Sequence, residues 1–344
     1  MKYIKQLGEI NKGDIAAVGG KGANLGEMFN AGFPVPDGFC ITGKAFDEYR
    51  QKNGFTGSTG SEMISGQLWE ELEQEIKKGY AGLGEHVRVA VRSSATAEDL
   101  PEASFAGQQE TYLNIIGENE LFAAVKKCFA SLYSARAAAY RKQKNFGLEA
   151  ISLAVVVQKM VESEVSGVLF TADPIRQDRG HMVMNASWGL GEAVVSGKVT
   201  PDTYGYDKRK RRVTDKKLGE KGISIGYGTD GVEERKTLPE KRNQFCLTDK
   251  QASEIFEMGQ RIERHYGSPQ DIEWAVCEDR LYILQSRPIT TLEEERPKQP
   301  GPSAAQKAVL SNWIEHCPYP LYPLDVEPYK MVDGAKARVF NELG

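Results

Sequence analysis

The chain contains 344 residues, of which 44 are Lys or Arg and 48 are Asp or Glu, giving a formal net charge of −4. This balance excludes the strongly basic surface that is typical of nucleic-acid-binding proteins, so we expect no nucleic-acid partner. The sequence has no run of about 18 apolar residues and no apolar secretory core near its start. The five cysteines are scattered and form no C-x-x-C pair. We therefore expect a cytoplasmic protein without membrane contact.

The first expected unit, residues 1–85, carries a glycine-dense segment around Lys21. Apolar residues recur at helical spacing after Gly22, which places Lys21 at the start of a helix. Glycines let a backbone approach a phosphate closely, and a lysine adds positive charge. The GGKG spacing matches neither a P-loop nor a dinucleotide fingerprint, so a helix start with a solvated lysine stays open as the alternative. A short strand is expected over 39–42, and a charged helix over 66–78.

The second expected unit, residues 86–195, begins with a β-strand that contains Arg92 and ends in small hydroxyl residues. A guanidinium beside hydroxyl groups suits a phosphate, because arginine binds oxyanions through two hydrogen bonds. An arginine paired with an acidic residue in a capped turn is the equal alternative. Further elements follow in this unit: a helix over 118–145, a hairpin-like pair of strands within 151–161 and 166–174, and a strand over 182–186 that leads through a glycine turn into a helix.

The third expected unit, residues 196–292, contains a basic run over 208–212 between two strands, which we interpret as a solvated hairpin tip. A helix is expected from Asp249 to Tyr266, followed by two strands that pair across a short turn at residues 278–280. Residues 293–344 combine charge, proline and glycine, and we expect a linker and a truncated tail that leads to a missing domain.

The last two expected strands carry oxygen ligands and a cation with a spacing of two residues. Asp271 and Glu273 share one face of the first strand, and Gln285 and Arg287 share one face of the second. Carboxylate and amide oxygens are hard ligands that suit Mg²⁺, and the arginine would hold a phosphate beside the ion. A plain cross-strand salt bridge between Glu273 and Arg287 is the alternative.

Five sequence blocks together resemble one protein family. The blocks cover residues 19–39, 89–114, 156–174, 185–202 and 271–290. They are similar to the ATP-binding domain of phosphoenolpyruvate synthase (pyruvate, water dikinase), pyruvate phosphate dikinase and rifampicin phosphotransferase, over about residues 10–292. The resemblance implies an α+β ATP-grasp fold, with an N-terminal α/β lobe, a C-terminal β-rich lobe and ATP between them. Residues 1–85 would be the N-terminal part of the first lobe, residues 86–195 the rest of that lobe and a hinge, and residues 196–292 the C-terminal lobe.

The resemblance also implies roles for individual residues. Lys21, Arg92 and Arg287 would be the catalytic cations that hold and transfer phosphate, and Glu273 and Gln285 would hold Mg²⁺ beside Asp271. The remaining ATP-binding positions would be Ser93, Thr96, Gly107, Gln108, Thr111, Gln158, Met160, Val161 and Glu192.

In this family ATP is split to AMP, and a phosphoryl group passes through a histidine on a separate swivelling domain to an acceptor. No stretch of the 344 residues resembles that histidine motif or the acceptor-binding domain. We therefore expect both as partners, on the same longer chain or on a separate subunit. The acceptor stays open between pyruvate, rifampicin and the phenol of a phenylphosphate synthase-type system. A nucleotide-sensing module without transfer is the alternative from another class.

Overall fold

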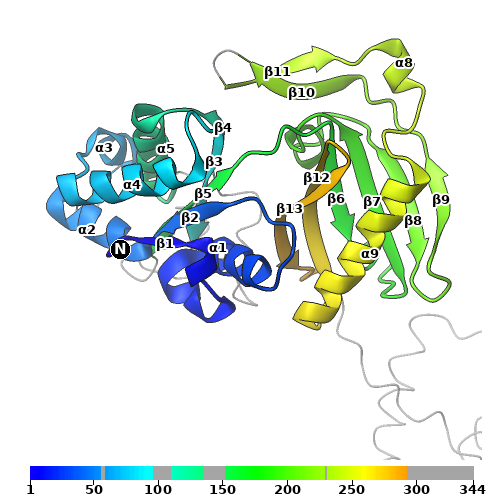
Figure 1. The fold of residues 1–344 in the computed structure, drawn as a ribbon, viewed down its shortest axis with the longest axis horizontal. Helices are drawn as coiled ribbons and strands as arrows, with labels where there is room; N and C mark the ends of the chain where they lie inside the picture. The colour runs from blue at the N-terminus through cyan, green and yellow to red at the C-terminus, as the bar shows by residue number, and fades with distance from the viewer. Residues whose placement is uncertain (56–58, 96–109, 135–151, 229–230, 293–344) are drawn as a thin grey trace, which may run out of the picture. The chain divides into compact units, whose positions relative to one another are not determined.

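The computed structural model describes residues 1–55, 59–95, 110–134, 152–228 and 231–292, and Met1–Leu292 form one compact unit. Two antiparallel sheets organise this unit (Figure 1). Among the described residues, no helix is both long and apolar enough to cross a bilayer. The expected sites at Thr96, Gly107 and Gln108 lie outside the described residues, as do the second half of the helix expected over 118–145 and all of 293–344.

The first sheet has five strands and forms the centre of the first lobe. Its spatial order is β1 (Ile4–Gln6), β2 (Gly38–Ile41), β5 (Leu153–Lys159), β3 (Val89–Ala95) and β4 (Thr111–Ile115). Strand β5 is buried on both faces because its residues alternate between two hydrophobic clusters. Val155 and Val157 pack into one cluster, and Val156 packs into the other. Side chains at even-numbered positions of β5 therefore face the second lobe.

Helices cover both faces of this sheet. Residues from four of the helices share the cluster of Val155 and Val157: α2 (Gly43–Lys52), α3 (Gly60–Ser65), α4 (Glu70–Leu83) and α5 (Glu118–Ser131). Helix α1 (Ile15–Asn30), preceded by short 3-10 turns at Leu7–Glu9 and Lys12–Asp14, packs into the cluster of Val156. Helix α1 thus lies on the face of the sheet that is turned toward the second lobe.

The second sheet has six strands and forms the centre of the second lobe. Its order is β13 (Arg280–Pro288), β12 (Gln270–Cys277), β6 (Val165–Phe170), β7 (His181–Trp188), β8 (Asp202–Asp207) and β9 (Arg212–Lys217). Helix α9 (Asp249–Tyr266) lies across one face of it (Figure 1), where Phe256 stacks on Tyr206 of β8. The sequence predicted the bounds of α9 well because Thr248 and Gln251 form a capping box and Gly267 ends the helix in a left-handed conformation.

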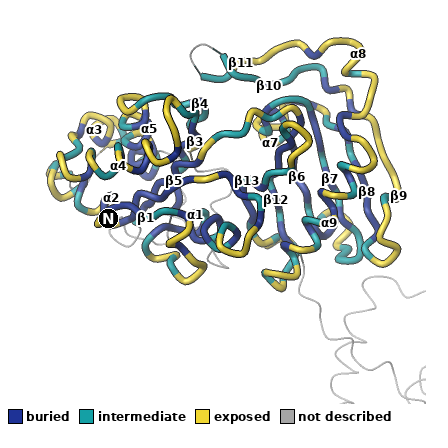
Figure 2. The backbone as a smooth tube through the Cα atoms, in the orientation of Figure 1, coloured by how far each residue is buried: buried dark blue, intermediate teal, exposed yellow. Residues whose placement is uncertain are grey.

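Three smaller elements complete the second lobe. They are α7 (Glu192–Val195), α8 (Pro239–Arg242) and a hairpin of β10 (Ile223–Gly228) and β11 (Gly231–Lys236). The hairpin is a separate two-stranded sheet, and Figure 2 shows that it is much less buried than central strands of the main sheets such as β5 and β6. Together the two lobes form the two-lobed α+β architecture that the resemblance implied.

The strands on either side of residue 160 differ from the expectation. We expected 151–161 and 166–174 to pair as a hairpin, but β5 pairs with β2 and β3, whereas β6 pairs with β12 and β7. The chain therefore passes from one sheet to the other over residues 160–164, which we call the connecting segment. As a result, β6 and β7 belong to the second lobe, although we expected the first lobe to extend to residue 195. Periodicity identifies strands, but it does not say which sheet they join.

Candidate functional site

A cavity of about 290 Å³ lies between the two sheets. Strands β3, β4 and β5, helix α1 and the connecting segment contribute its first-lobe side, and β6, α7, β12 and β13 contribute the rest. Ten residues that the sequence singled out line this cavity: Lys21, Arg92, Thr111, Gln158, Met160, Val161, Glu192, Glu273, Gln285 and Arg287. Residues separated by more than 260 positions in the sequence are thus gathered around one space.

Lys21 reaches the cavity from a kink in α1. Gly19 has φ 69° and ψ 173°, so the helix breaks there and begins again just before Lys21. The hydroxyl of Ser94, on β3, donates to the carbonyl of Val18 (2.8 Å) and accepts from the amide of Gly22 (3.2 Å), so it holds both sides of the break. A Cβ at Gly19 would lie 2.3 Å from the carbonyl oxygen of Ser94, which only glycine avoids. The kink therefore depends on glycine and on the end of β3.

Arg92 joins the two lobes directly. Its side chain is 12% exposed, and its Nη1 donates to Gln285 Oε1 at 3.3 Å while its Nη2 donates to Glu273 Oε2 at 3.4 Å. These acceptors stand opposite each other in the register of β12 and β13. Glu273 and Gln285 thus lie side by side on the last two strands, and the guanidinium of the first lobe lies against their oxygens. Their role as metal ligands stays a prediction.

Arg287 forms its ion pair with Asp271 and not with Glu273. The two residues are register partners on β13 and β12, and Arg287 Nη2 and Nε lie 2.7 and 2.9 Å from Asp271 Oδ2. Burial raises the pKa of the Asp271 carboxyl above its ordinary value, and the neighbouring Arg287 opposes that shift. Asp271 is not among the residues that line the cavity, so it contacts the site through Arg287.

Three buried donors around the cavity have no acceptor among the described residues. They are Gln158 Nε2, Trp274 Nε1 and Arg92 Nε. Gln158 is 2% exposed and lies opposite Ala90 in the register of β5 and β3. Ala90 precedes Arg92 by two residues, so Gln158 lies near Arg92 on the same face of the sheet. An unsatisfied buried donor costs about 1–3 kcal/mol. A ligand rich in hydrogen-bond acceptors would remove this cost.

Apolar residues also line the cavity, and the sequence identified only some of them. Met160 and Val161 had been expected, whereas Leu113, Trp274 and Leu284 had not. Leu284 directly precedes Gln285 and is the extra residue of a β-bulge in β13, because Glu273 pairs with Gln285 whereas Trp274 pairs with Ile283. This bulge explains why simple alternation did not place Leu284 at the cavity. Ser94 was also missed as the residue that holds the kink in α1.

Ser93 lies away from the cavity. It is fully buried, and its hydroxyl donates to the carbonyl of Glu110 at 3.4 Å. Strand alternation explains this position, because Arg92 faces the second lobe and the next residue faces the opposite way. Thr111 and Glu192 do line the cavity, from β4 and α7.

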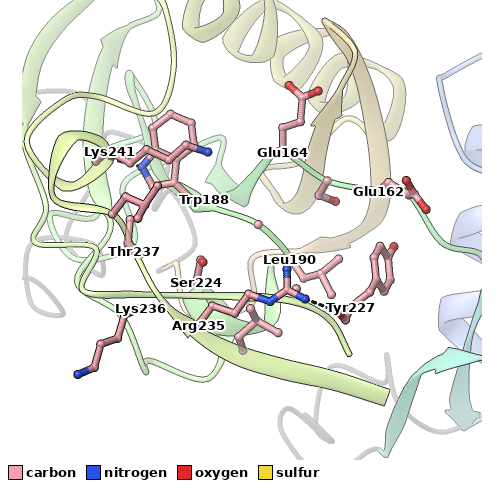
Figure 3. Close-up of a pocket in the computed structure, with 15 residues that line it drawn as sticks. Glu162, Glu164, Trp188, Leu190, Ser224, Tyr227, Arg235, Lys236, Thr237 and Lys241 are labelled. Carbon is pink, nitrogen blue, oxygen red and sulfur yellow. Dashed lines mark hydrogen bonds between the residues drawn. The ribbon is translucent and has the colours of Figure 1, made fainter. Parts of the chain in front are cut away.

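A second cavity of about 490 Å³ lies under the β10–β11 hairpin and shares Ser163 and Leu190 with the first. Figure 3 shows Trp188 and Lys241 at one end of it and Tyr227 at the other, with the side chain of Arg235 between them. Lys241 Nζ lies 5.0 Å from the centre of the Trp188 ring, and the Trp188 Nε1 donates to the carbonyl of Lys241 at 3.0 Å. Its charged residues have both signs, and we assign it no ligand.

Comparison with known proteins identifies the family. The model of the pyruvate phosphate dikinase AMP/ATP-binding domain matches residues 15–308. The probable phosphoenolpyruvate synthase of Archaeoglobus fulgidus is 46% identical over 316 residues, covering 84% of this chain and 42% of the relative. The phosphoenolpyruvate synthase of Pyrococcus furiosus is 42% identical, covering 90% and 46%, and the rifampicin phosphotransferase of Bacillus cereus is 41% identical, covering 84% and 36%.

The chain spans less than half the length of each of these relatives. Its match to the domain model nevertheless includes every described residue of the cavity. The chain belongs to the pyruvate phosphate dikinase AMP/ATP-binding domain family.

Proposed function

We propose that the cavity binds ATP with Mg²⁺ and that this chain is the nucleotide-binding part of a phosphoenolpyruvate synthase-like phosphotransferase. ATP would be split to AMP; one phosphoryl group would pass to a histidine on a separate swivelling domain, and the other would be released to water as phosphate. The observation that carries the proposal is the meeting of Arg92 from one lobe with Glu273 and Gln285 from the other, in a cavity that Lys21 and Arg287 also line. Phosphoryl transfer requires mainly positioning and neutralisation of charge, which these groups supply.

The residues on β12 and β13 fit a magnesium ion. In phosphoryl-transfer sites Mg²⁺ keeps one or two protein ligands and takes the rest from phosphates and water. The Glu273 carboxylate and the Gln285 amide oxygen provide such a pair, because both already accept hydrogen bonds from the same guanidinium. Across the part of the chain that the structure describes, no group of three or more His, Cys, Asp or Glu forms a complete metal site. The ion would therefore bind together with the nucleotide and neutralise charge on its phosphates.

The rest of the nucleotide fits the remaining walls. Gln158 Nε2 and Trp274 Nε1 offer unsatisfied donors, and Leu113, Met160 and Val161 offer apolar surface for a base. Lys21, at the restart of α1, adds positive charge at the start of a helical segment, where backbone amides favour a phosphate. Arg287, oriented by Asp271, would stabilise the transferred phosphate.

An Arg287→Ala variant tests the proposal. We expect ATP binding to stay measurable by calorimetry, while phosphoryl transfer to an added histidine-bearing domain of a phosphoenolpyruvate synthase falls by roughly 100-fold or more. Arg264→Ala is the matched control, because Arg264 is an exposed residue of α9 whose guanidinium donates to the carbonyl of Gln260, one turn earlier in the same helix. Unchanged transfer by the Arg287 variant would contradict its role. ATP binding without formation of AMP by the wild type would favour a nucleotide-sensing module.

The acceptor has a second candidate. The relative named rifampicin phosphotransferase matches this chain with nearly the same identity as the phosphoenolpyruvate synthases. Supplying the wild-type chain with the remaining parts of either relative, and then measuring consumption of pyruvate and of rifampicin, distinguishes the two.

A further inference from the structure

The connecting segment forms one wall of the cavity, and backbone hydrogen bonds anchor its two ends to the two lobes. Met160 donates its amide to the carbonyl of Arg88 at 2.9 Å, on the side of the first lobe. Glu164 donates its amide to the carbonyl of Val276 at 2.9 Å, on β12 of the second lobe. Met160, Val161 and Ser163 between these anchors all line the cavity. The position of this wall therefore depends on what holds the middle of the segment.

Tyr227 of β10 holds that middle. Its hydroxyl donates to the carbonyl of Val161 at 2.8 Å. The guanidinium of Arg88 lies 4.9 Å from the centre of the Tyr227 ring and also donates to Glu162 at 2.9 Å. Burial raises the pKa of Tyr227 to about 12, so its hydroxyl remains a donor throughout the physiological range. Tyr227 thus contacts the segment by a hydrogen bond and contacts the residue that anchors its start.

Both lobes in turn hold the hairpin that carries Tyr227. Asn114 of β4 donates from Nδ2 to the carbonyl of Gly231 at 2.5 Å, and its own amide lies 2.9 Å from the sulfur of Met160. Leu190, in the second lobe, donates its amide to the carbonyl of Ile225 at 2.8 Å. Asn114 is 4% exposed and has φ 59°, a left-handed conformation that asparagine tolerates better than most residues. The hairpin therefore bridges the first lobe, the second lobe and the cavity wall.

The second cavity shows that close packing does not fix the hairpin on its other side. Its 490 Å³ separate Tyr227 and Arg235 from Trp188 and Lys241 (Figure 3). Within the hairpin, Arg235 Nη2 donates to the carbonyl of Tyr227 at 2.7 Å, which steadies the backbone at that residue. The hairpin is therefore positioned from the side of the nucleotide cavity, by the hydrogen bonds of Tyr227, Asn114 and Leu190 and by the packing of its apolar residues in the cluster of Leu190 and Ile225.

We propose that Tyr227 and Asn114 are positioning residues for the base-binding end of the nucleotide site, acting through Val161 and Met160. This inference rests on the proposed function and deepens it. Met160 and Val161 belong to the apolar wall, whereas the phosphate-binding candidates Lys21, Arg92 and Arg287 lie on other elements. Loss of the hairpin contacts should therefore weaken recognition of the base and leave recognition of the phosphates intact.

The test compares Mg-ATP with Mg-tripolyphosphate, which has the phosphates without the nucleoside, by calorimetry on the full chain. Tyr227→Phe removes one hydroxyl, and we expect it to weaken ATP binding roughly 3- to 10-fold, as one lost hydrogen bond does. Tripolyphosphate affinity should change by less than about twofold. Tyr49→Phe is the matched control, because Tyr49 makes the same kind of bond, to the carbonyl of Met63 at 2.6 Å, in the core of the first lobe.

Asn114→Asp keeps the shape of the side chain and removes the Nδ2 donor. It should likewise weaken ATP binding while leaving tripolyphosphate affinity nearly unchanged. Equal weakening of both ligands by either variant would show a general structural role and overturn the inference. Unchanged ATP affinity in Tyr227→Phe would also overturn it. A wild-type chain that binds tripolyphosphate and ATP equally would refute base recognition, and one that binds neither would refute the proposed function itself.

Discussion

Removal of either partner of the buried Asp202–Lys221 pair should destabilise the second lobe, and by unequal amounts. Both side chains are fully buried, and Lys221 Nζ bonds to Asp202 Oδ1 and to the carbonyl of Gly219, the latter at 2.9 Å. Asp202 also accepts from the amides of Gly219 and Cys246, each at 2.8 Å. It therefore ties the start of β8 to the segments that precede β10 and α9.

The expected magnitudes follow from what each substitution leaves unpaired. Breaking a buried pair costs about 3–5 kcal/mol. Lys221→Met leaves an aspartate that keeps two backbone donors, so we expect a loss near ~3 kcal/mol. Asp202→Ala leaves the buried ammonium of Lys221 with one carbonyl as its acceptor, and it leaves the amides of Gly219 and Cys246 without theirs. We therefore expect a loss of ~5 kcal/mol or more in the free energy of unfolding.

Equilibrium urea unfolding, followed by circular dichroism and by tryptophan fluorescence, measures both losses. Lys217→Met, at an exposed position of β9, is the control and should change stability by less than about 0.5 kcal/mol. Equal losses from the two buried variants, or a larger loss from Lys221→Met, would refute the reasoning that backbone donors support Asp202.

Two further substitutions test the kink in α1 and the turn before β7. Gly19→Ala should lower the free energy of unfolding by about 2 kcal/mol or more and weaken ATP binding. Gly32→Ala is the control: Gly32 has φ 76° but nothing lies within 4 Å of an added Cβ, so the loss should be about 1 kcal/mol. Equal melting temperatures of the two variants would contradict this reasoning. The pKa of Asp178 is lowered below its ordinary value of 3.8, first by the amide of Gly180 and then by His181, so its contribution to stability is present above that value and is lost as the pH falls through the lowered pKa. Asp178→Asn should therefore lower the melting temperature at pH 6, and the difference from the wild type should shrink as the pH falls below 3.8. A difference that stays constant as the pH falls would be inconsistent with the shift.

The sequence predicted the second half of the site better than the first. The pairing of β12 with β13 follows from two alternating runs around a short turn. The register that places Glu273 opposite Gln285 and Asp271 opposite Arg287 depends in addition on the β-bulge at Leu284, which the sequence pattern does not show. The ion pair of Arg287 with Asp271 follows from the same register, although the alternative we had kept was a pair with Glu273.

The rest required the three-dimensional structure. Nothing in the spacing of β5 and β6 indicates that they enter different sheets, because each is a continuous apolar run. The sequence also does not show that Ser94 fixes the position of Lys21. Ser94, at the end of β3, binds the helix break through the amide of Gly22, which lies 72 positions away in the sequence. Contacts between residues distant in sequence are not encoded in local patterns, and both examples are of that kind.

The engagement of Arg92 by two oxygens of the opposite lobe has a consequence for ligand discrimination. An incoming anion must replace a carboxylate and an amide that already accept hydrogen bonds from Nη1 and Nη2 of Arg92, so the gain in free energy at these two atoms comes only from the difference between old and new partners. Under the proposed function, we expect a ligand with one phosphate to compete poorly in such an exchange and a triphosphate carrying its own counter-ion to compete well. The resting interaction would thereby favour departure of a spent monophosphate and keep the pocket available for fresh substrate.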